Sequence, residues 1–301
     1  MRQSAWLPLL AFVVLAHVDN VQASCLSGAP TPLPIGRVPG TLVDAITPPP
    51  EAMPSNAAAD YSMGERHQWL SDGYLLEIVH WLRHGQDAGV AYTVQAANRS
   101  RLSLLHTPAW QGLYLAPARG PARWLATPDA PQLAAQGVAP APGVQTPRAA
   151  YSAGGQYDIA LYVCVSPQAL QQLGGEELFT LYIRLLALTV NAPLREAGVE
   201  NVRVHAAGYW EMNDNPPATA QALTDVAPGT AAVGLTMLLV EDPAHAGTTW
   251  LNGPVAVMPV RRPLALRQSL ARSTAGQDST ANLAQAWREA APRWAAGQTG
   301  R

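Results

Sequence analysis

Three apolar segments in the middle of the chain constrain its fold more than any other feature. Tyr157 to Val165 is apolar on both faces apart from Asp158, a pattern typical of a strand that is covered on both sides. Glu176 to Ala197 starts with two acidic residues and carries a long apolar stripe, which predicts a helix. Val202 to Trp210 has the pattern of a second strand. A strand, a helix and a strand in this order, at about 157–210, predict a crossover unit with parallel strands.

Shorter apolar runs flank this unit on both sides. Val90 to Val94 and Arg101 to Leu105 alternate in polarity and are separated by Asn98-Arg99-Ser100, so they predict a hairpin. Leu75 to Arg83 places its aliphatic residues on one helical face, which predicts an amphipathic helix that ends near Gly85. Further strands are predicted at Leu113–Leu115, Arg123–Leu125, Ala231–Val240 and Pro254–Val260, and a last helix at Ala281–Ala296.

These elements predict an α+β or α/β fold, with a mixed central sheet and helices packed against it. A chain of 301 residues can bury a sizeable core, and we expect a single globular domain at 61–301. Residues 24–60 are rich in proline, which cannot hold a helix or complete a ladder of hydrogen bonds. We interpret this segment as an extended linker or as a strap that lies over the domain.

The first 23 residues carry the three parts of a secretory signal peptide. Arg2 precedes an unbroken apolar stretch from Ala5 to Ala16, and Val21-Gln22-Ala23 supplies the ending before the cleavage site. The apolar stretch is shorter than the roughly 20 residues that a membrane span needs. We therefore expect cleavage after Ala23, a mature chain without a transmembrane span, and a periplasmic or secreted location.

The chain has only two cysteines, Cys25 and Cys164. In an oxidising compartment such a pair favours a disulfide, which would pin the Pro-rich segment to the domain. A lipid anchor on Cys25 is the alternative, because bacterial lipoprotein signals also end in a small residue before a cysteine. Gln22 stands where such signals usually carry Leu. A buried Cys164 that forms no bond is the third interpretation.

Charge and lysine content exclude several classes of function. Charged residues make up 13% of the chain and the net charge is -2, so we expect no nucleic acid partner. All 19 basic residues are arginines, which excludes mechanisms that need a lysine amine, such as a Schiff base or a Walker-type phosphate site. The absence of lysine beside much Ala, Pro and Arg indicates a GC-rich bacterial genome, which makes the periplasm the expected compartment.

Glu77, His80 and His84 form the sharpest cluster of chemically active side chains. On the helix predicted there they share one face, and imidazole and carboxylate groups suit a transition metal. The cluster lacks the His-Glu-x-x-His order of zinc proteases, and a solvated helix face would have the same composition. We therefore expect no metal and no other cofactor, with these three residues as the candidate ligands if a metal binds.

A second cluster lies at the end of the strand that follows the long helix. His205, Glu211 and Asp214 are candidate acid and base residues, because ligands bind outside the carboxyl ends of parallel strands. Tyr209 and Trp210 are candidate binding residues beside them. The competing interpretation is an ordinary strand end that runs into a turn.

Motifs of nucleophilic catalysis and of phosphate binding are absent from the sequence, which has no Gly-x-Ser-x-Gly elbow and no Gly-rich phosphate loop. We therefore predict a non-catalytic envelope protein that acts as an adaptor, assembly factor or binding protein, with a protein partner in the cell envelope. The alternative is an exported hydrolase. It would use either a metal at Glu77, His80 and His84 or an acid and base pair at Glu211 and Asp214.

Overall fold

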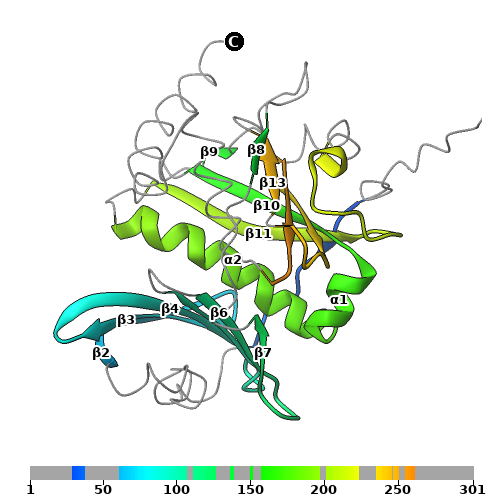
Figure 1. The fold of residues 1–301 in the computed structure, drawn as a ribbon. Helices are drawn as coiled ribbons and strands as arrows, with labels where there is room; N and C mark the ends of the chain where they lie inside the picture. The colour runs from blue at the N-terminus through cyan, green and yellow to red at the C-terminus, as the bar shows by residue number, and fades with distance from the viewer. Residues whose placement is uncertain are drawn as a thin grey trace, which may run out of the picture.

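The computed structural model describes residues 29–37, 61–106, 111–126, 136–138, 150–151, 157–196, 201–223, 235–245, 247–250 and 255–261. These residues build two β-sheets with helices between them (Figure 1). In chain order the elements are β1 (Thr31–Pro32), β2 (Tyr61–Ser71), β3 (Tyr74–Arg83), β4 (Gln86–Gln95), β5 (Arg101–His106), β6 (Gln111–Ala116), β7 (Arg123–Ala126), β8 (Gln136–Val138), β9 (Ala150–Tyr151), β10 (Tyr157–Val165), α1 (Pro167–Leu173), α2 (Glu176–Glu196), β11 (Val202–Glu211), β12 (Leu235–Val240), β13 (Thr248–Trp250) and β14 (Val255–Pro259).

The larger sheet is mixed and has parallel strands at its centre. β10 lies between β11 and β12 and runs parallel to both, and β14 runs parallel to β12 on its far side. β1 is antiparallel to β11, β9 to β10 and β13 to β14, and β8 pairs with β13 in parallel at the edge. The chain passes from β10 to β11 on one side and then to β12 on the other, so its direction of travel reverses at β10.

The second sheet is an antiparallel meander of six strands, β2 to β7 in chain order. Two-residue turns, Asp72-Gly73 and His84-Gly85, join β2 to β3 and β3 to β4. All four turn residues have positive φ, between 51° and 78°. Turns of this kind match the twist of paired strands, which explains the tight hairpins.

The helix α2 lies between the two sheets and forms the middle layer of the molecule (Figure 1). Every residue from Leu178 to Val190 is buried, because α2 packs on β11 of the mixed sheet and on β4 and β5 of the meander. A helix that is buried around its whole circumference is a core helix. Phe179 belongs to one continuous apolar cluster with Val163 of β10 and Leu104 of β5, so the two sheets share a single core.

Residues 29–37, which we call the N-terminal strap, lie against the domain. The strand β1 within the strap pairs with β11, and Leu33 is buried in the core. The Gly36 N–H donates a hydrogen bond of 2.8 Å to the Asp72 carbonyl oxygen. Here the backbones approach so closely that a Cβ on Gly73 would lie 2.0 Å from Gly36 O, so only glycine fits. The strap is therefore a packed part of the structure.

The predicted mixed sheet with packed helices is confirmed in its coarse form. The predicted hairpin is also confirmed, since β4 and β5 pair in antiparallel register. The long helix occurs as α2. Predicted strands are found as β6, β7, β10, β11, β12 and β14, with ends shifted by a few residues.

The helix predicted at Leu75 to Arg83 is wrong, because this segment is the strand β3. Both faces of β3 carry buried side chains, with Leu75 and Val79 on one and Ile78 on the other. An apolar run that is buried on both faces of a sheet can have the same sequence pattern as the apolar stripe of a helix. The tight turns at both ends of β3 place it in two hairpins, and pairing with β2 and β4 makes this segment a strand.

Several predictions concern residues outside those that the structure describes. These are the signal peptide at 1–23, Cys25, the part of the Pro-rich segment at 38–60, and the helix at Ala281–Ala296. Within the described ranges, no helix has the length and apolar character needed to cross a membrane.

Candidate functional site

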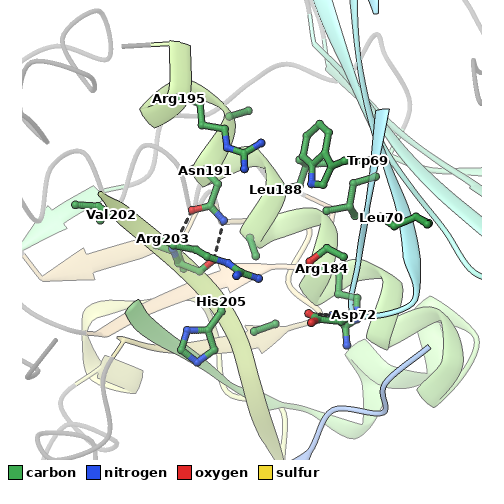
Figure 2. Close-up of a pocket in the computed structure, with 16 residues that line it drawn as sticks. Trp69, Leu70, Asp72, Arg184, Leu188, Asn191, Arg195, Val202, Arg203 and His205 are labelled. Carbon is green, nitrogen blue, oxygen red and sulfur yellow. Dashed lines mark hydrogen bonds and ion pairs between the residues drawn. The ribbon is translucent and has the colours of Figure 1, made fainter. Parts of the chain in front are cut away.

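A pocket of about 270 Å³ opens at the edge of β11, where the two sheets approach the central helix (Figure 2). Its described lining comes from the end of β2 with its turn, residues 69–72; from Leu76 of β3; from the second half of α2, residues 184–195; and from the first half of β11, residues 202–206. Pockets for drug-sized ligands measure roughly 300 to 1,000 Å³. The pocket therefore suits a small ligand.

Arg184 lines this pocket and connects three parts of the structure. Its side chain is only 8% exposed, and Nη1 lies 2.8 Å from Asp72 Oδ2. Nη2 donates a hydrogen bond of 2.9 Å to the carbonyl oxygen of Pro34 in the strap. The guanidinium also stacks on the ring of Tyr74, 4.2 Å from its centroid. One buried cation thus joins α2, the turn after β2 and the strap.

Two further arginines lie at the open side of the pocket. Arg195 is exposed near the end of α2, and its guanidinium lies 5.2 Å from the ring centroid of Trp69. Arg203 is exposed on β11, and Figure 2 shows its guanidinium extending towards Arg184 and Asp72. Among the described residues, neither Arg195 nor Arg203 forms an ion pair with a carboxylate. Both therefore remain available to an anion.

Asn191 holds β11 at the wall of the pocket. Its Nδ2 donates to the carbonyl oxygen of Val204 at 2.7 Å, and its Oδ1 accepts from the Val204 N–H at 2.8 Å. The side-chain amide thus forms the two hydrogen bonds that a neighbouring strand would otherwise form at this edge of the sheet. Unpaired backbone groups at a sheet edge can pair with a strand of another molecule. This arrangement fixes the position of the strand that carries Arg203.

The lining combines an excess of positive charge with an apolar wall. Among the described lining residues there are three arginines and one carboxylate, Asp72, and that carboxylate is already paired. The apolar wall consists of Trp69, Leu70, Leu76, Leu188 and Val202. Arginine binds carboxylates and phosphates through parallel N–H donors. The arrangement can therefore hold a small anion that also has an apolar part.

His205, a predicted acid or base residue, belongs to the rim of this pocket. Its imidazole lies on the opposite side of β11 from Trp69 and Arg195 (Figure 2). Burial lowers the pKa of His205, so the ring is neutral near pH 7. Its Nδ1 is buried and has no hydrogen-bond partner. The structure thus places His205 beside the pocket and away from the other predicted acid and base residues.

The other residues predicted around the end of β11 lie elsewhere. Glu211 is exposed and Asp214 half-buried, and neither lines the pocket. Tyr209 is buried, packs edge-on against Phe179 and donates a hydrogen bond of 2.7 Å to Glu176 Oε1. Trp210 is buried too, and stacks against Tyr162 with 5.4 Å between ring centroids. Both aromatic residues therefore pack within the fold.

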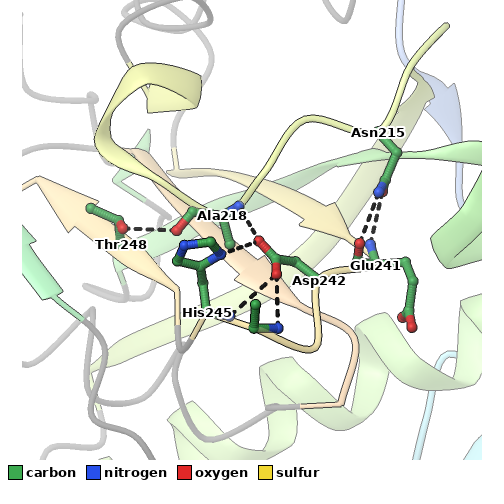
Figure 3. A network of polar contacts seen from close by, with 7 residues as sticks. Asn215, Ala218, Glu241, Asp242, His245 and Thr248 are labelled. Atoms are coloured by element: carbon green, nitrogen blue, oxygen red, sulfur yellow. Dashed lines mark hydrogen bonds and ion pairs between the residues drawn. The ribbon is translucent and has the colours of Figure 1, made fainter.

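A polar network occupies the carboxyl ends of the parallel strands (Figure 3). Asp242 is the second residue after β12, and its Oδ2 lies 2.7 Å from His245 Nδ1. The same carboxylate accepts N–H groups of Ala218, Ala244 and His245 at 2.8 to 3.2 Å. Burial disfavours its ionised form, but these hydrogen bonds outweigh burial and lower the pKa of Asp242. An ionised aspartate thus orients a half-exposed imidazole.

The candidate metal ligands do not come together. In the strand β3, Glu77 and His80 point to opposite faces of the sheet, and His84 lies in the following turn. Glu77 is fully buried and forms an ion pair with Arg66. Within the described residues, no group of three His, Cys, Asp or Glu side chains could hold a metal ion.

Cys164, the predicted disulfide partner, is fully buried in β10. In the sheet it lies between Trp210 of β11 and Leu238 of β12. Because Cys25 lies outside the described residues, the disulfide between the two cysteines stays a prediction.

Sequence reasoning missed the three arginines of the pocket. Arg184, Leu188, Asn191 and Arg195 are spaced by four, three and four residues and share one face of α2. Polar residues on one face of a helix that is otherwise buried are the signal that could have located this site. Comparison with protein-family models finds no match for this chain, and neither does comparison with curated proteins.

Proposed function

We propose that this chain is an exported, non-catalytic binding protein of the cell envelope whose ligand is a small anion held in the arginine-lined pocket. The observation that carries the proposal is the unbalanced charge of the described lining, with three guanidinium groups against one carboxylate. Arg184 already neutralises this carboxylate at 2.8 Å, so within the described residues Arg195 and Arg203 have no anionic partner. An anionic ligand would supply it.

The proposal also covers the export of the chain and the arrangement of the domain that carries the pocket. The signal peptide at 1–23 would direct the chain to the periplasm, and the strap would be fixed by a disulfide between Cys25 and Cys164. A right-handed crossover at about 157–210 would carry α2 across the mixed sheet, with the domain at 61–301 as one unit. The predicted protein partner in the envelope would meet the ligand-bound form.

Thermal unfolding with matched ligands tests the proposed function. A ligand that binds only the folded state raises the unfolding midpoint. We expect benzoate to raise the midpoint of the mature protein, and benzylammonium, which has a similar body and the opposite charge, to leave it unchanged. The benzoate shift should disappear in the double variant Arg195→Gln, Arg203→Gln. It should persist in Arg119→Gln, which removes an exposed arginine outside the pocket. A shift with benzylammonium as large as that with benzoate would contradict the proposal.

The Asp242 and His245 pair supports a second candidate function, that of a hydrolase. It lies where ligands bind in parallel sheets, outside the carboxyl ends of the strands and beside the point where strand order reverses. His245 would take a proton from water as the hydroxide adds to the ester carbonyl carbon. When the resulting tetrahedral intermediate collapses and the C–O bond to the leaving group breaks, the imidazolium would return this proton to the departing oxygen, which leaves as the alcohol. Hydrolysis of chromogenic esters that is lost in His245→Asn and kept in His67→Asn, an exposed control, would support it. Equal rates of ester hydrolysis in the two variants would rule out this hydrolase function.

A further inference from the structure

We infer that the ligand of the arginine-lined pocket is a small monocarboxylate with an apolar body and no amine. This inference rests on the proposed function and names the chemical class of the anion. It follows from three features of the described lining: the apolar wall, the position of Arg195 and Arg203, and the single carboxylate, which is already occupied.

The apolar wall distinguishes an organic anion from an inorganic one. Trp69, Leu76 and Leu188 line the pocket, and Leu70 at its rim is 46% exposed. Burying apolar surface is favourable by about 25 cal/mol per Å². A free phosphate or sulfate ion has no apolar surface to place against this wall, whereas the body of an organic acid has.

Two arginines that form no ion pair within the described residues set the position of the charged group. Arg195 stacks over Trp69 at 5.2 Å, so its guanidinium is held beside the apolar wall. Arg203 extends from β11 towards Arg184 and Asp72 (Figure 2), and Asn191 fixes the edge of that strand. A carboxylate at the guanidinium of Arg195 would receive parallel N–H donors, and Arg203 would add positive charge from β11. The apolar body of the ligand would then lie along Trp69.

The occupied carboxylate argues against an amine on the ligand. Among the described residues that line the pocket, Asp72 is the only acidic one, and Arg184 already binds it at 2.8 Å. An ammonium group would meet three guanidinium groups there and, within the described lining, no second carboxylate. Like charges that cannot be paired are a means of rejecting a ligand. Amino acids are thereby disfavoured relative to acids with the same body.

Isothermal titration calorimetry of the mature protein with four related compounds tests this inference. Phenylacetate has the acid and the body, phenylalanine adds an amine, 2-phenylethanol lacks the charge, and inorganic phosphate lacks the body. We expect phenylacetate to bind at least about tenfold more tightly than each of the other three, as the loss of one charged hydrogen bond implies. Arg203→Gln and Trp69→Ala should each weaken phenylacetate binding by a similar factor, and Arg119→Gln should not.

The outcomes separate this inference from the proposed function. If phenylalanine or phosphate binds as tightly as phenylacetate, the inferred class is wrong and the anion pocket stands. If 2-phenylethanol binds as tightly as phenylacetate, charge has no part in binding, and both the inference and the proposed function are overturned. If none of the four compounds binds, the inference is likewise overturned.

Discussion

Arg184 and Asp72 join the buried central helix to the turn between β2 and β3, with Nη1 and Oδ2 2.8 Å apart. Both residues line the pocket, and the same guanidinium holds the strap through the carbonyl oxygen of Pro34. A single buried side chain therefore has two tasks. It keeps the N-terminal strap on the domain, and it supplies part of the positive lining.

Replacing this arginine should loosen the strap as well as destabilise the fold. Arg184→Met keeps most of the side-chain volume but removes the bonds to Asp72 and Pro34, and we expect a loss of roughly 2 kcal/mol in the free energy of unfolding. Urea denaturation measures this loss, and limited proteolysis measures release of the strap. Arg119→Met is the matched control on an exposed site. Equal stability of the two variants would show that the bonds of Arg184 to Asp72 and Pro34 do not stabilise the fold.

Asn191 offers a test of how the edge of β11 is maintained. Asn191→Leu preserves the shape of the side chain but leaves the N–H and carbonyl of Val204 without their bonds at 2.7 and 2.8 Å. We expect a destabilisation of roughly 2 kcal/mol, because two hydrogen bonds are lost. Hydrogen exchange should also become faster at the Val204 amide. The exposed Gln171→Leu serves as control, and unchanged protection of Val204 would count against this role.

The Asp242 network predicts a dependence of stability on acid pH. Its hydrogen bonds outweigh burial and lower the pKa of the carboxyl in the folded state, so the unfolded state binds the proton more readily. The stabilisation is complete above the unfolded pKa of about 3.9 and is lost as pH falls through the folded pKa. In Asp242→Asn the stability at neutral pH should be lower and the acid decline shallower. Urea midpoints measured from pH 7 down to acid conditions decide this, and parallel curves for the two proteins would refute it.

The proposed disulfide can be tested by mass. All basic residues are arginines, so trypsin cuts only at these positions and separates Cys25 from Cys164. We expect one linked pair of peptides without reductant and two separate peptides after reduction. A lipid-modified Cys25 would appear as a heavier peptide that is unaffected by reductant. Two unlinked, alkylated cysteines in the unreduced sample would exclude the bond.

The elements with long, unambiguous patterns were predictable from the sequence. α2 and β10 have clear periods and lengths, and the β4 and β5 hairpin has a turn signal between two alternating runs. The strand β3 was not recognised, although Asp72-Gly73 before it is among the strongest short-range signals of a hairpin. The sequence from Leu75 to Arg83 fits both the helical period and the strand period. Pairing with the neighbouring strands determines that it is a strand.

The candidate site was less predictable than the fold. Arg184, Asn191 and Arg195 share a helical face, but Arg203 and Trp69 meet them only because α2 is enclosed between two sheets. Such a meeting depends on contacts between segments far apart in sequence, which no local pattern encodes. His205 was singled out for its place on the strand and proves to lie at the rim of the pocket.

The indole N–H resonance of Trp69, followed by NMR during titration with benzoate, tests the central claim most directly. Trp69 lies in the pocket wall beside Arg195, so a bound anion must change its surroundings. Substitution Trp69→Phe identifies the signal. We expect a saturable shift with benzoate that is absent in Arg195→Gln, Arg203→Gln and absent with benzylammonium. A Trp69 signal that stays in place throughout the benzoate titration would contradict the existence of an anion-binding pocket.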